Sequence, residues 1–293
     1  MADQDLKGKT FLVTGANSGI GKVTATKLAA MNAQVVMLCR NRKRAEQARD
    51  EIVHQTNNTD VFILLADLSD QRQIFGVARE FCRMFDKLDV LINNAGIIDH
   101  GKTITPDGLE RTFAINHLGA FLLTNLLKKP LQHADAARII TVSSEAHKYA
   151  DLDMNDLQLE HGYYPLKAYA NSKLCNILFT KALDKRLQQN RCDITANCLH
   201  PGAVATKFGD KGSIWFKLIW FLSKPFLISP EKGAETMLYL ATDDSAKNRS
   251  GEYFKNCTIS EVSDSAANET LAEQLWQRSI ELTSSELDDD HLF

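Results

Sequence analysis

Short apolar runs that alternate with longer helical stretches extend over most of this chain. Such runs are too uniformly apolar to lie on a one-sided sheet, so they predict strands that are buried on both faces. Strands separated by helices favour a parallel sheet with helices wound on both of its sides. The predicted strands are Thr10–Thr14, Gln34–Cys39, Val61–Ala66, Asp89–Ile92, Arg138–Val142 and Asp193–Leu199.

Helical periodicity fills the intervals between these strands. A helix is expected after Ser69 or Asp70, either of which can cap its first turn. The other predicted helices run from Ile20 to Met31, Arg42 to Gln55, Asp107 to Lys128, and through Tyr169 to Gln189.

No repeat or low-complexity linker divides the 293 residues, of which 44% are hydrophobic. A chain of this length and composition can bury one large core. We therefore expect a single Rossmann-type α/β domain over residues 1–293, a doubly wound parallel sheet with helices on both faces. Within it, residues 203–229 are expected to form a substrate lid, and residues 262–293 a C-terminal helix and acidic tail.

Charge and cysteine usage exclude several classes of protein. The net charge is −3 with no long basic run, which argues against a nucleic-acid partner. The six cysteines form no Cys-x-x-Cys pair, the histidines show no metal-ligand spacing, and no metal is predicted. The polar first residues match neither a signal peptide nor a membrane span. We expect a cytoplasmic protein with reduced thiols.

A glycine-rich turn, Thr14-Gly-Ala-Asn-Ser-Gly-Ile-Gly21, joins the first strand to the first helix. Glycines at such a turn let the backbone approach a pyrophosphate, with the helix amides facing the anion. The spacing differs from the Gly-x-Gly-x-x-Gly fingerprint, and a turn without a ligand is the alternative. The residues expected at the dinucleotide are Gly15, Asn17, Ser18, Gly19, Ile20 and Gly21.

Arg40 ends the second strand, where NAD-specific enzymes carry an acidic residue for the ribose 2′-hydroxyl. A guanidinium at that position suits a 2′-phosphate, so NADP(H) is predicted in preference to NAD(H). The neighbouring Arg42, Lys43 and Arg44 are read as an exposed first helical turn.

Two further strand ends carry candidate cofactor residues. Asp67 and Leu68 end the third strand, where the Asp67 carboxylate either accepts from the adenine amine or caps the next helix. Asn94-Ala95-Gly96 ends the fourth strand, and its small residues permit backbone contact with a cofactor. Asn93 is expected instead to support the sheet edge.

Gly96-Ile-Ile-Asp-His-Gly-Lys-Thr103 matches the P-loop pattern letter for letter. A P-loop needs a helix that starts at its Lys-Thr pair, whereas Ile104-Thr-Pro-Asp-Gly108 is a turn signal. An NTPase is therefore not predicted. A serine hydrolase is excluded too, because no Gly-x-Ser-x-Gly surrounds Ser144.

Tyr169 and Lys173 stand four positions apart on a predicted helix, which places the phenol beside the ammonium. A free tyrosine has a pKa of about 10 and exchanges protons poorly near neutrality. A fixed lysine cation favours the phenolate, so the Lys173 side chain is expected to lower the pKa of Tyr169.

Taken together, these motifs resemble the short-chain dehydrogenase/reductase superfamily over nearly the whole chain, and most closely its retinol-dehydrogenase-like branch. The resemblance rests on the glycine turn and on Asn93-Asn-Ala-Gly96, Asp107-Gly-Leu-Glu110, Asn116-His-Leu-Gly119, Phe121-Leu-Leu-Thr-Asn125, Val142-Ser-Ser144, Ala168-Tyr-Ala-Asn-Ser-Lys-Leu174 and Leu199-His-Pro-Gly202.

The resemblance implies a catalytic tetrad of Asn116, Ser144, Tyr169 and Lys173. Tyr169 would exchange a proton with the substrate oxygen, Ser144 would hydrogen-bond that oxygen, and Lys173 would hold the nicotinamide ribose. Asn116 would position a water. Ser143 is the weaker candidate because successive strand residues face opposite ways. The segment implied to cover the nicotinamide contains Pro201, Gly202, Val204 and Thr206.

The expected reaction is an NADP(H)-dependent interconversion of a lipophilic carbonyl, such as an aldehyde, ketone, retinoid or steroid, and its alcohol. The apolar segment 214–222 favours that substrate class, and pocket wall, peripheral membrane contact, oligomer contact and core packing all remain open for it. The apolar helix after Tyr169 is compatible with a subunit contact in a homo-oligomer. The rival function is a non-catalytic dinucleotide-binding redox sensor.

Overall fold

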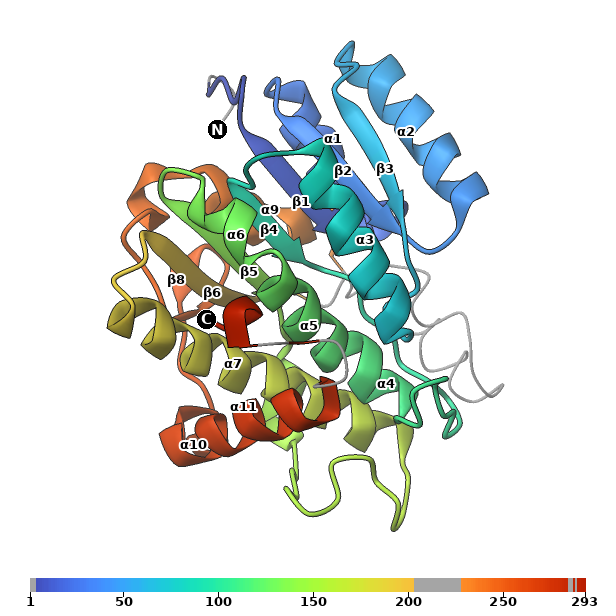
Figure 1. The fold of residues 1–293 in the computed structure, drawn as a ribbon, viewed down its shortest axis with the longest axis vertical. Coiled ribbons are helices and arrows are strands. Elements are labelled where there is room, and N and C mark those ends of the chain that lie inside the picture. The colour runs from blue at the N-terminus through green and yellow to red at the C-terminus, as the bar shows by residue number, and fades with distance from the viewer. Residues whose placement is uncertain (1–3, 203–227, 284–286, 288) are drawn as a thin grey trace.

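The computed structural model describes residues 4–202, 228–283, 287 and 289–293, and shows one eight-stranded sheet enclosed by helices (Figure 1). The strands lie in the order β3-β2-β1-β4-β5-β6-β7-β8, and all pairs are parallel except β7 with β8. Their bounds are β1 (Thr10–Thr14), β2 (Gln34–Cys39), β3 (Val61–Leu65), β4 (Val90–Asn93), β5 (Ala137–Val142), β6 (Ile194–His200), β7 (Tyr253–Lys255) and β8 (Thr258–Ile259).

The helical elements fill the connections between the strands. They are α1 (Gly19–Ala30), α2 (Arg42–Thr56), α3 (Gln71–Met84), α4 (Arg111–Phe113), the π-helix η1 (Ala114–Leu118), α5 (Gly119–Leu126), α6 (Lys128–Gln132), the 3₁₀ turn η2 (Glu145–Tyr149), α7 (Pro165–Gln189), α9 (Pro230–Thr242), the 3₁₀ turn η5 (Asp244–Ala246), α10 (Asp264–Ala267), α11 (Glu269–Thr283) and the 3₁₀ turn η6 (Asp289–His291).

Alternate residues of the longer strands enter two different cores. Leu12 of β1 packs with α3, α5, α7 and α11 on one face of the sheet, whereas its neighbours Phe11 and Val13 pack with α1, α2 and α9 on the other. This two-fold alternation, with apolar residues at most positions, is why the strands read as largely hydrophobic runs. The predicted doubly wound α/β fold is confirmed.

The structure differs from the predicted elements in three details. The helix expected to begin at Asp107 begins at Arg111, because the Glu110 carboxylate accepts hydrogen bonds from the Thr112 and Phe113 amides and caps it there. This helix is also interrupted by the π-helix η1. Strands β7 and β8 were not predicted, since elements of three and two residues are too short to show a periodicity.

The apolar face of α7 that suggested a subunit contact is covered by this chain itself. Leu174, Leu178 and Leu183 are fully buried, and they belong to the core cluster that includes Trp276 of α11. Figure 1 shows α11 lying against α7. These leucines therefore give no support to the expected helix-to-helix contact between subunits.

Candidate active site

The carboxyl edge of the sheet gathers most of the predicted cofactor residues. Gly15 has a φ of +69°, and a Cβ on Gly21 would lie 2.5 Å from Nδ2 of Asn94 and 2.6 Å from the Gly15 oxygen. Glycine is therefore required for α1 to approach the turn that closely. Ser18, the N-cap of α1, makes no side-chain cap hydrogen bond. The Ser18 side chain thus leaves the first amides of α1 to another acceptor, and a pyrophosphate fits that role.

Asn94 and Ala95 tie this turn to the end of β4. The Thr14 hydroxyl accepts from the amides of Asn94 and Ala95 at 2.9 and 2.8 Å, and Asn94 Nδ2 donates to the Thr14 oxygen at 2.7 Å. Asn93 points the other way and donates to Thr124 at 2.9 Å, as expected of a residue that supports the sheet. The Asn94 side-chain amide thus donates its hydrogen bond within the protein.

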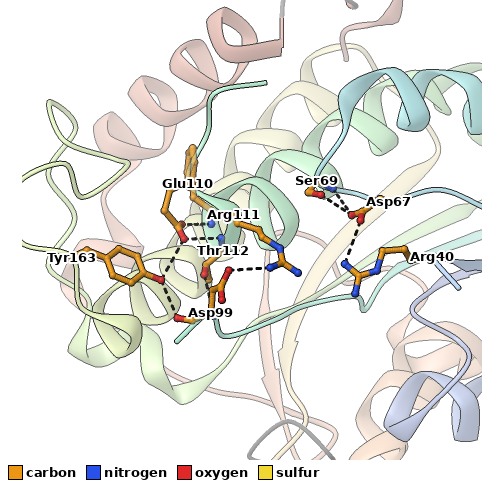
Figure 2. A network of polar contacts seen from close by, with 9 residues as sticks. Arg40, Asp67, Ser69, Asp99, Glu110, Arg111, Thr112 and Tyr163 are labelled. Atoms are coloured by element: carbon orange, nitrogen blue, oxygen red, sulfur yellow. Dashed lines mark hydrogen bonds and ion pairs between the residues drawn. The ribbon is translucent and has the colours of Figure 1, made fainter. Parts of the chain in front are cut away.

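Arg40 and Asp67 lie together at the ends of β2 and β3 (Figure 2). Nη1 of Arg40 is 3.2 Å from Oδ2 of Asp67, and Oδ1 of Asp67 accepts from the amide and hydroxyl of Ser69. Burial alone would raise the pKa of Asp67, but the Ser69 hydrogen bonds and the Arg40 charge outweigh it and lower the pKa. The helix-cap alternative for Asp67 is wrong, because Asp70 caps α3. Leu68 packs against Gly119.

Tyr169 and Ser144 meet at the next strand end. The Ser144 hydroxyl hydrogen-bonds Tyr169 and accepts from the Ala146 amide at 3.2 Å, which fixes it at the start of η2. Ser143 faces away, as predicted, and its buried hydroxyl donates to the Lys173 oxygen at 2.7 Å. The two neighbouring serines thus have different surroundings, and only Ser144 meets the phenol.

Lys173 is buried one helical turn beyond Tyr169. Its Nζ donates to the Val142 oxygen at 2.9 Å, lies 5.6 Å from the Tyr169 ring centroid, and would be 3.4 Å from a Cβ on Gly96. Burial lowers the pKa of Lys173 to about 8. The phenol, ammonium and serine hydroxyl therefore converge at one place.

The prediction that the pKa of Tyr169 is lowered is wrong for this structure. Burial is the largest influence and raises the pKa of Tyr169, while the hydrogen bond with Ser144 opposes that rise only in part. Helical spacing indicated the closeness of Lys173 but not the desolvation that the fold imposes on the phenol.

Asn116 lies in η1 with its side chain fully engaged. Oδ1 accepts from the Ile97 amide at 2.8 Å, and Nδ2 donates to the Ile97 oxygen and to Ser172 Oγ, each at 2.9 Å. The side-chain amide thus holds the loop after β4 against α7. Its backbone lies in a π turn, an irregularity frequent at functional sites.

Pro201 and Gly202 follow β6 and are partly exposed at the same edge of the sheet. Gly202 has a φ of +91°, and a Cβ there would lie 2.3 Å from Cδ1 of Ile228. Val204, Thr206, nearly all of the predicted lid 203–229 and the whole apolar segment 214–222 lie outside the described residues.

A network that the sequence did not indicate borders this site (Figure 2). The buried Glu110 carboxylate caps α4, and the Tyr163 hydroxyl donates to the Asp99 oxygen at 3.0 Å and lies 3.5 Å from Oε1 of Glu110. Arg111 pairs with the Asp99 carboxylate at 3.2 Å. The network joins the loop after β4 to the segment before α7. Only the capping pattern of Glu110 before Thr112 could have signalled it.

The P-loop match is a loop without a helix behind it. Lys102 Nζ donates to the Leu159 oxygen at 3.0 Å, and Ile104 forms an isolated bridge with Glu110. Rejection of a P-loop is confirmed. In the described part of the chain, no cluster of three or more His, Cys, Asp or Glu side chains is placed to hold a metal. No described helix has the length and apolar character to cross a membrane.

The chain is similar to known proteins in sequence and in fold. The family model described as short chain dehydrogenase matches residues 9–215. The chain is 41% identical to human (Homo sapiens) retinol dehydrogenase 12 over 277 residues, 94% of this chain and 87% of that protein. Its identity to human retinol dehydrogenase 14 is 38% over 287 residues, 92% of this chain and 85% of that protein.

Two solved structures are similar as well. A protein of unassigned function from Mycobacterium paratuberculosis superposes with a TM-score of 0.78 at 32% identity, covering 96% of this chain and 95% of that one. A short chain dehydrogenase from Shigella flexneri, complexed with NADP, gives 0.68 at 25% identity, covering 87% and 100%. This chain belongs to the short chain dehydrogenase family, in its retinol-dehydrogenase-like branch, and is an oxidoreductase.

Proposed function

We propose that this enzyme interconverts a lipophilic carbonyl compound and its alcohol with NADP(H), and that Tyr169 is its acid and base. The observation that carries the proposal is the meeting of Tyr169 with Ser144, with Lys173 one turn along α7, beside Gly96 and the glycine turn before α1. A carbonyl oxygen at this point would find two hydroxyl donors.

The chain's residues fit a dinucleotide along the carboxyl edge of the sheet. The amides that open α1 would bind the pyrophosphate, Arg40 a 2′-phosphate, and Gly96 would allow close approach of the nicotinamide end. The end of β2 carries Arg40 in place of an acidic residue, and a similar solved structure is an NADP complex. Bound nicotinamide would supply or accept the hydride.

Each tetrad residue has a distinct part in this proposal. Tyr169 donates its phenolic proton to the substrate oxygen during reduction and takes a proton from the alcohol during oxidation. Ser144 hydrogen-bonds the same oxygen and orients it. Because burial raises the pKa of Tyr169, the phenol of the free enzyme is protonated, which is the form that reduction uses. Lys173, with its pKa near 8, would hold the ribose and balance charge on the phenolate.

The role proposed for Asn116 is a water site at its backbone oxygen. Both side-chain Nδ2 hydrogens are used and Oδ1 already accepts from Ile97, which leaves the main chain of the π turn for such a water. The lipophilic substrate is supported by the retinol dehydrogenases among the relatives and by the apolar composition of segment 214–222.

The test is Tyr169→Phe. We expect the affinity for NADPH to stay nearly unchanged, while turnover of retinal, long-chain aldehydes and steroid ketones falls by roughly a hundredfold or more. Cofactor fluorescence titration and steady-state kinetics measure the two effects. Tyr164→Phe is the matched control, since that residue is 59% exposed at the N-cap of α7, five positions earlier, and should keep full activity. Comparable turnover in Tyr169→Phe would dismiss this residue as the acid and base. A preference for small polar sugars would dismiss the substrate class.

A further inference from the structure

A line of buried polar side chains leads from Lys173 across α7 and η1 to α11. The Val142 oxygen accepts from Lys173 Nζ at 2.9 Å and from Asn176 Nδ2 at 3.0 Å. Behind Asn176 lies His117, the neighbour of Asn116, and the His117 Nε2 atom is 2.9 Å from Ser279 Oγ. The side chains of this line are at most 3% exposed.

The His117 ring packs on the face of α7 that carries Asn176, with its centroid 6.1 Å from that of Phe179, three residues along the helix. Asn176 Oδ1 and His117 Nδ1 are both buried, and neither has a partner at hydrogen-bond distance among the described residues. Burial lowers the pKa of His117 to about 3, and hydrogen bonding to Asn176 opposes that shift. The imidazole is therefore neutral, with one ring proton to place.

The position of that proton decides whether the line is connected. If His117 carries it on Nε2, then Nδ1 and Asn176 Oδ1 are two acceptors facing each other with no donor between them. If Ser279 donates to Nε2, the proton sits on Nδ1 and points toward Asn176 Oδ1. Ser279 Oγ lies 2.7 Å from the Leu275 oxygen as its donor, so its one hydroxyl hydrogen must turn from that carbonyl to donate to His117. The Leu275 carbonyl lies inside α11, where a backbone amide of the helix still supplies a donor. The second arrangement leaves fewer buried groups unpaired.

We propose that Asn176 is a positioning residue for Lys173, and that Nδ1-protonated His117, held by Ser279, fixes its amide. Asn176 shares the Val142 carbonyl with Lys173, so it limits how strongly that carbonyl draws the ammonium inward. Without Asn176, the carbonyl would bind Lys173 alone and hold it away from Tyr169 and the ribose. This inference rests on the proposed function for its kinetic part only.

The kinetic test is Asn176→Leu, compared with Thr180→Val. Thr180 lies one turn further along α7, is 1% exposed, and bonds the Asn176 backbone without reaching Val142. Leucine removes the Asn176 bond to the Val142 oxygen and the acceptor toward which His117 Nδ1–H points, so the melting temperature should fall and kinetics are compared well below it. We expect kcat to drop about tenfold at unchanged substrate KM, and the pH at half-maximal oxidation to move upward because the phenol loses its cation. Thr180→Val should keep the wild-type kcat and pH profile.

The second test needs no cofactor and no turnover. A long-range ¹H–¹⁵N spectrum of ¹⁵N-histidine-labelled protein, with His117→Phe to assign the signal, reports which ring nitrogen carries the proton. We expect Nδ1–H, and an Nε2–H imidazole would overturn the proposal. Wild-type kcat and pH profile in Asn176→Leu would overturn it too, as would equal losses in both α7 variants. Failure of the proposed function appears separately, as turnover retained by Tyr169→Phe.

Discussion

At the scale of single residues, Arg40 illustrates how an exposed ion pair can exchange one partner for another. Its guanidinium pairs with Asp67 at 3.2 Å, but the side chain is 55% exposed. Exposed pairs of this kind contribute little to stability, so an arriving 2′-phosphate can replace the carboxylate as the partner. Asp67 would remain held by the Ser69 hydrogen bonds.

We expect Arg40→Asp to weaken NADPH binding by roughly a hundredfold and NADH binding by less than about threefold, since only NADPH carries the 2′-phosphate. Dissociation constants from fluorescence titration at fixed salt give the comparison. Arg42→Asp is the control, because that side chain is 72% exposed and pairs with Glu46 within α2. Equal losses for both cofactors would reject the 2′-phosphate role of Arg40.

At the scale of elements, the contact between α7 and α11 is an aromatic interface. Trp276 is 2% exposed, stacks on Phe179 with ring centroids 6.0 Å apart, and meets Phe121 edge-on at 5.0 Å. The Arg186 guanidinium covers the indole at 4.1 Å. Such packing of large rings contributes more to stability than area alone.

Trp276→Ala should therefore lower the free energy of unfolding by about 3–5 kcal/mol, the usual loss for a large aromatic side chain removed from a core. Urea unfolding followed by circular dichroism measures it. Gln277→Ala changes the exposed neighbour on α11 and should stay within about 0.5 kcal/mol of the wild type. A loss no larger than that of Gln277→Ala would show that α11 contributes little to the fold.

Elements with a strong pattern were predictable, and those set by tertiary contacts were not. The six longer strands are almost continuously apolar and were found within a few residues of their bounds. The start of α4 was misplaced. The helix begins after Glu110 because this side chain caps it, and in the sequence a capping glutamate looks like any other acidic residue. Tyr163 and His117 went unnoticed for the same reason, since their partners Asp99 and Ser279 are distant in the chain.

At the scale of the whole molecule, two neutral histidines connect stability to pH, His117 in the core and the half-buried His200. Burial lowers the pKa of His117 to about 3 and that of His200 to about 4, against an ordinary value of 6.5. Unfolding exposes both rings, which then take up protons below pH 6.5. Their contribution is therefore complete above pH 6.5 and is lost progressively as the pH falls toward 4.

We expect the free energy of unfolding to decrease between pH 6.5 and 5 by up to about 1.4 kcal/mol per pH unit for each of these histidines. Urea titrations at pH 7.5, 6 and 5 measure the slope. His117→Phe places a similar ring among aromatic neighbours and should make the slope shallower. A wild-type protein equally stable at pH 7.5 and 5 would contradict this reading of the two imidazoles.

The sequence predicted which residues meet in the candidate site better than it predicted their pKa values. Helical spacing placed Tyr169 beside Lys173, and strand alternation separated Ser144 from Ser143. The desolvation of Tyr169 was not predictable, because it depends on how several distant segments close over one ring. The engagement of the Asn116 amide by Ile97 and Ser172 likewise exists only in the folded chain.

The helix that lies over α7 has a consequence for self-association. Because α11 already occupies that surface, a second molecule could dock there only by displacing Trp276 and its aromatic neighbours from their own chain. The exchange would expose apolar surface of α11 while burying apolar surface of α7, so the hydrophobic effect would give little net free energy of association. A dimer that buried this apolar face of α7 would first require α11 to leave it.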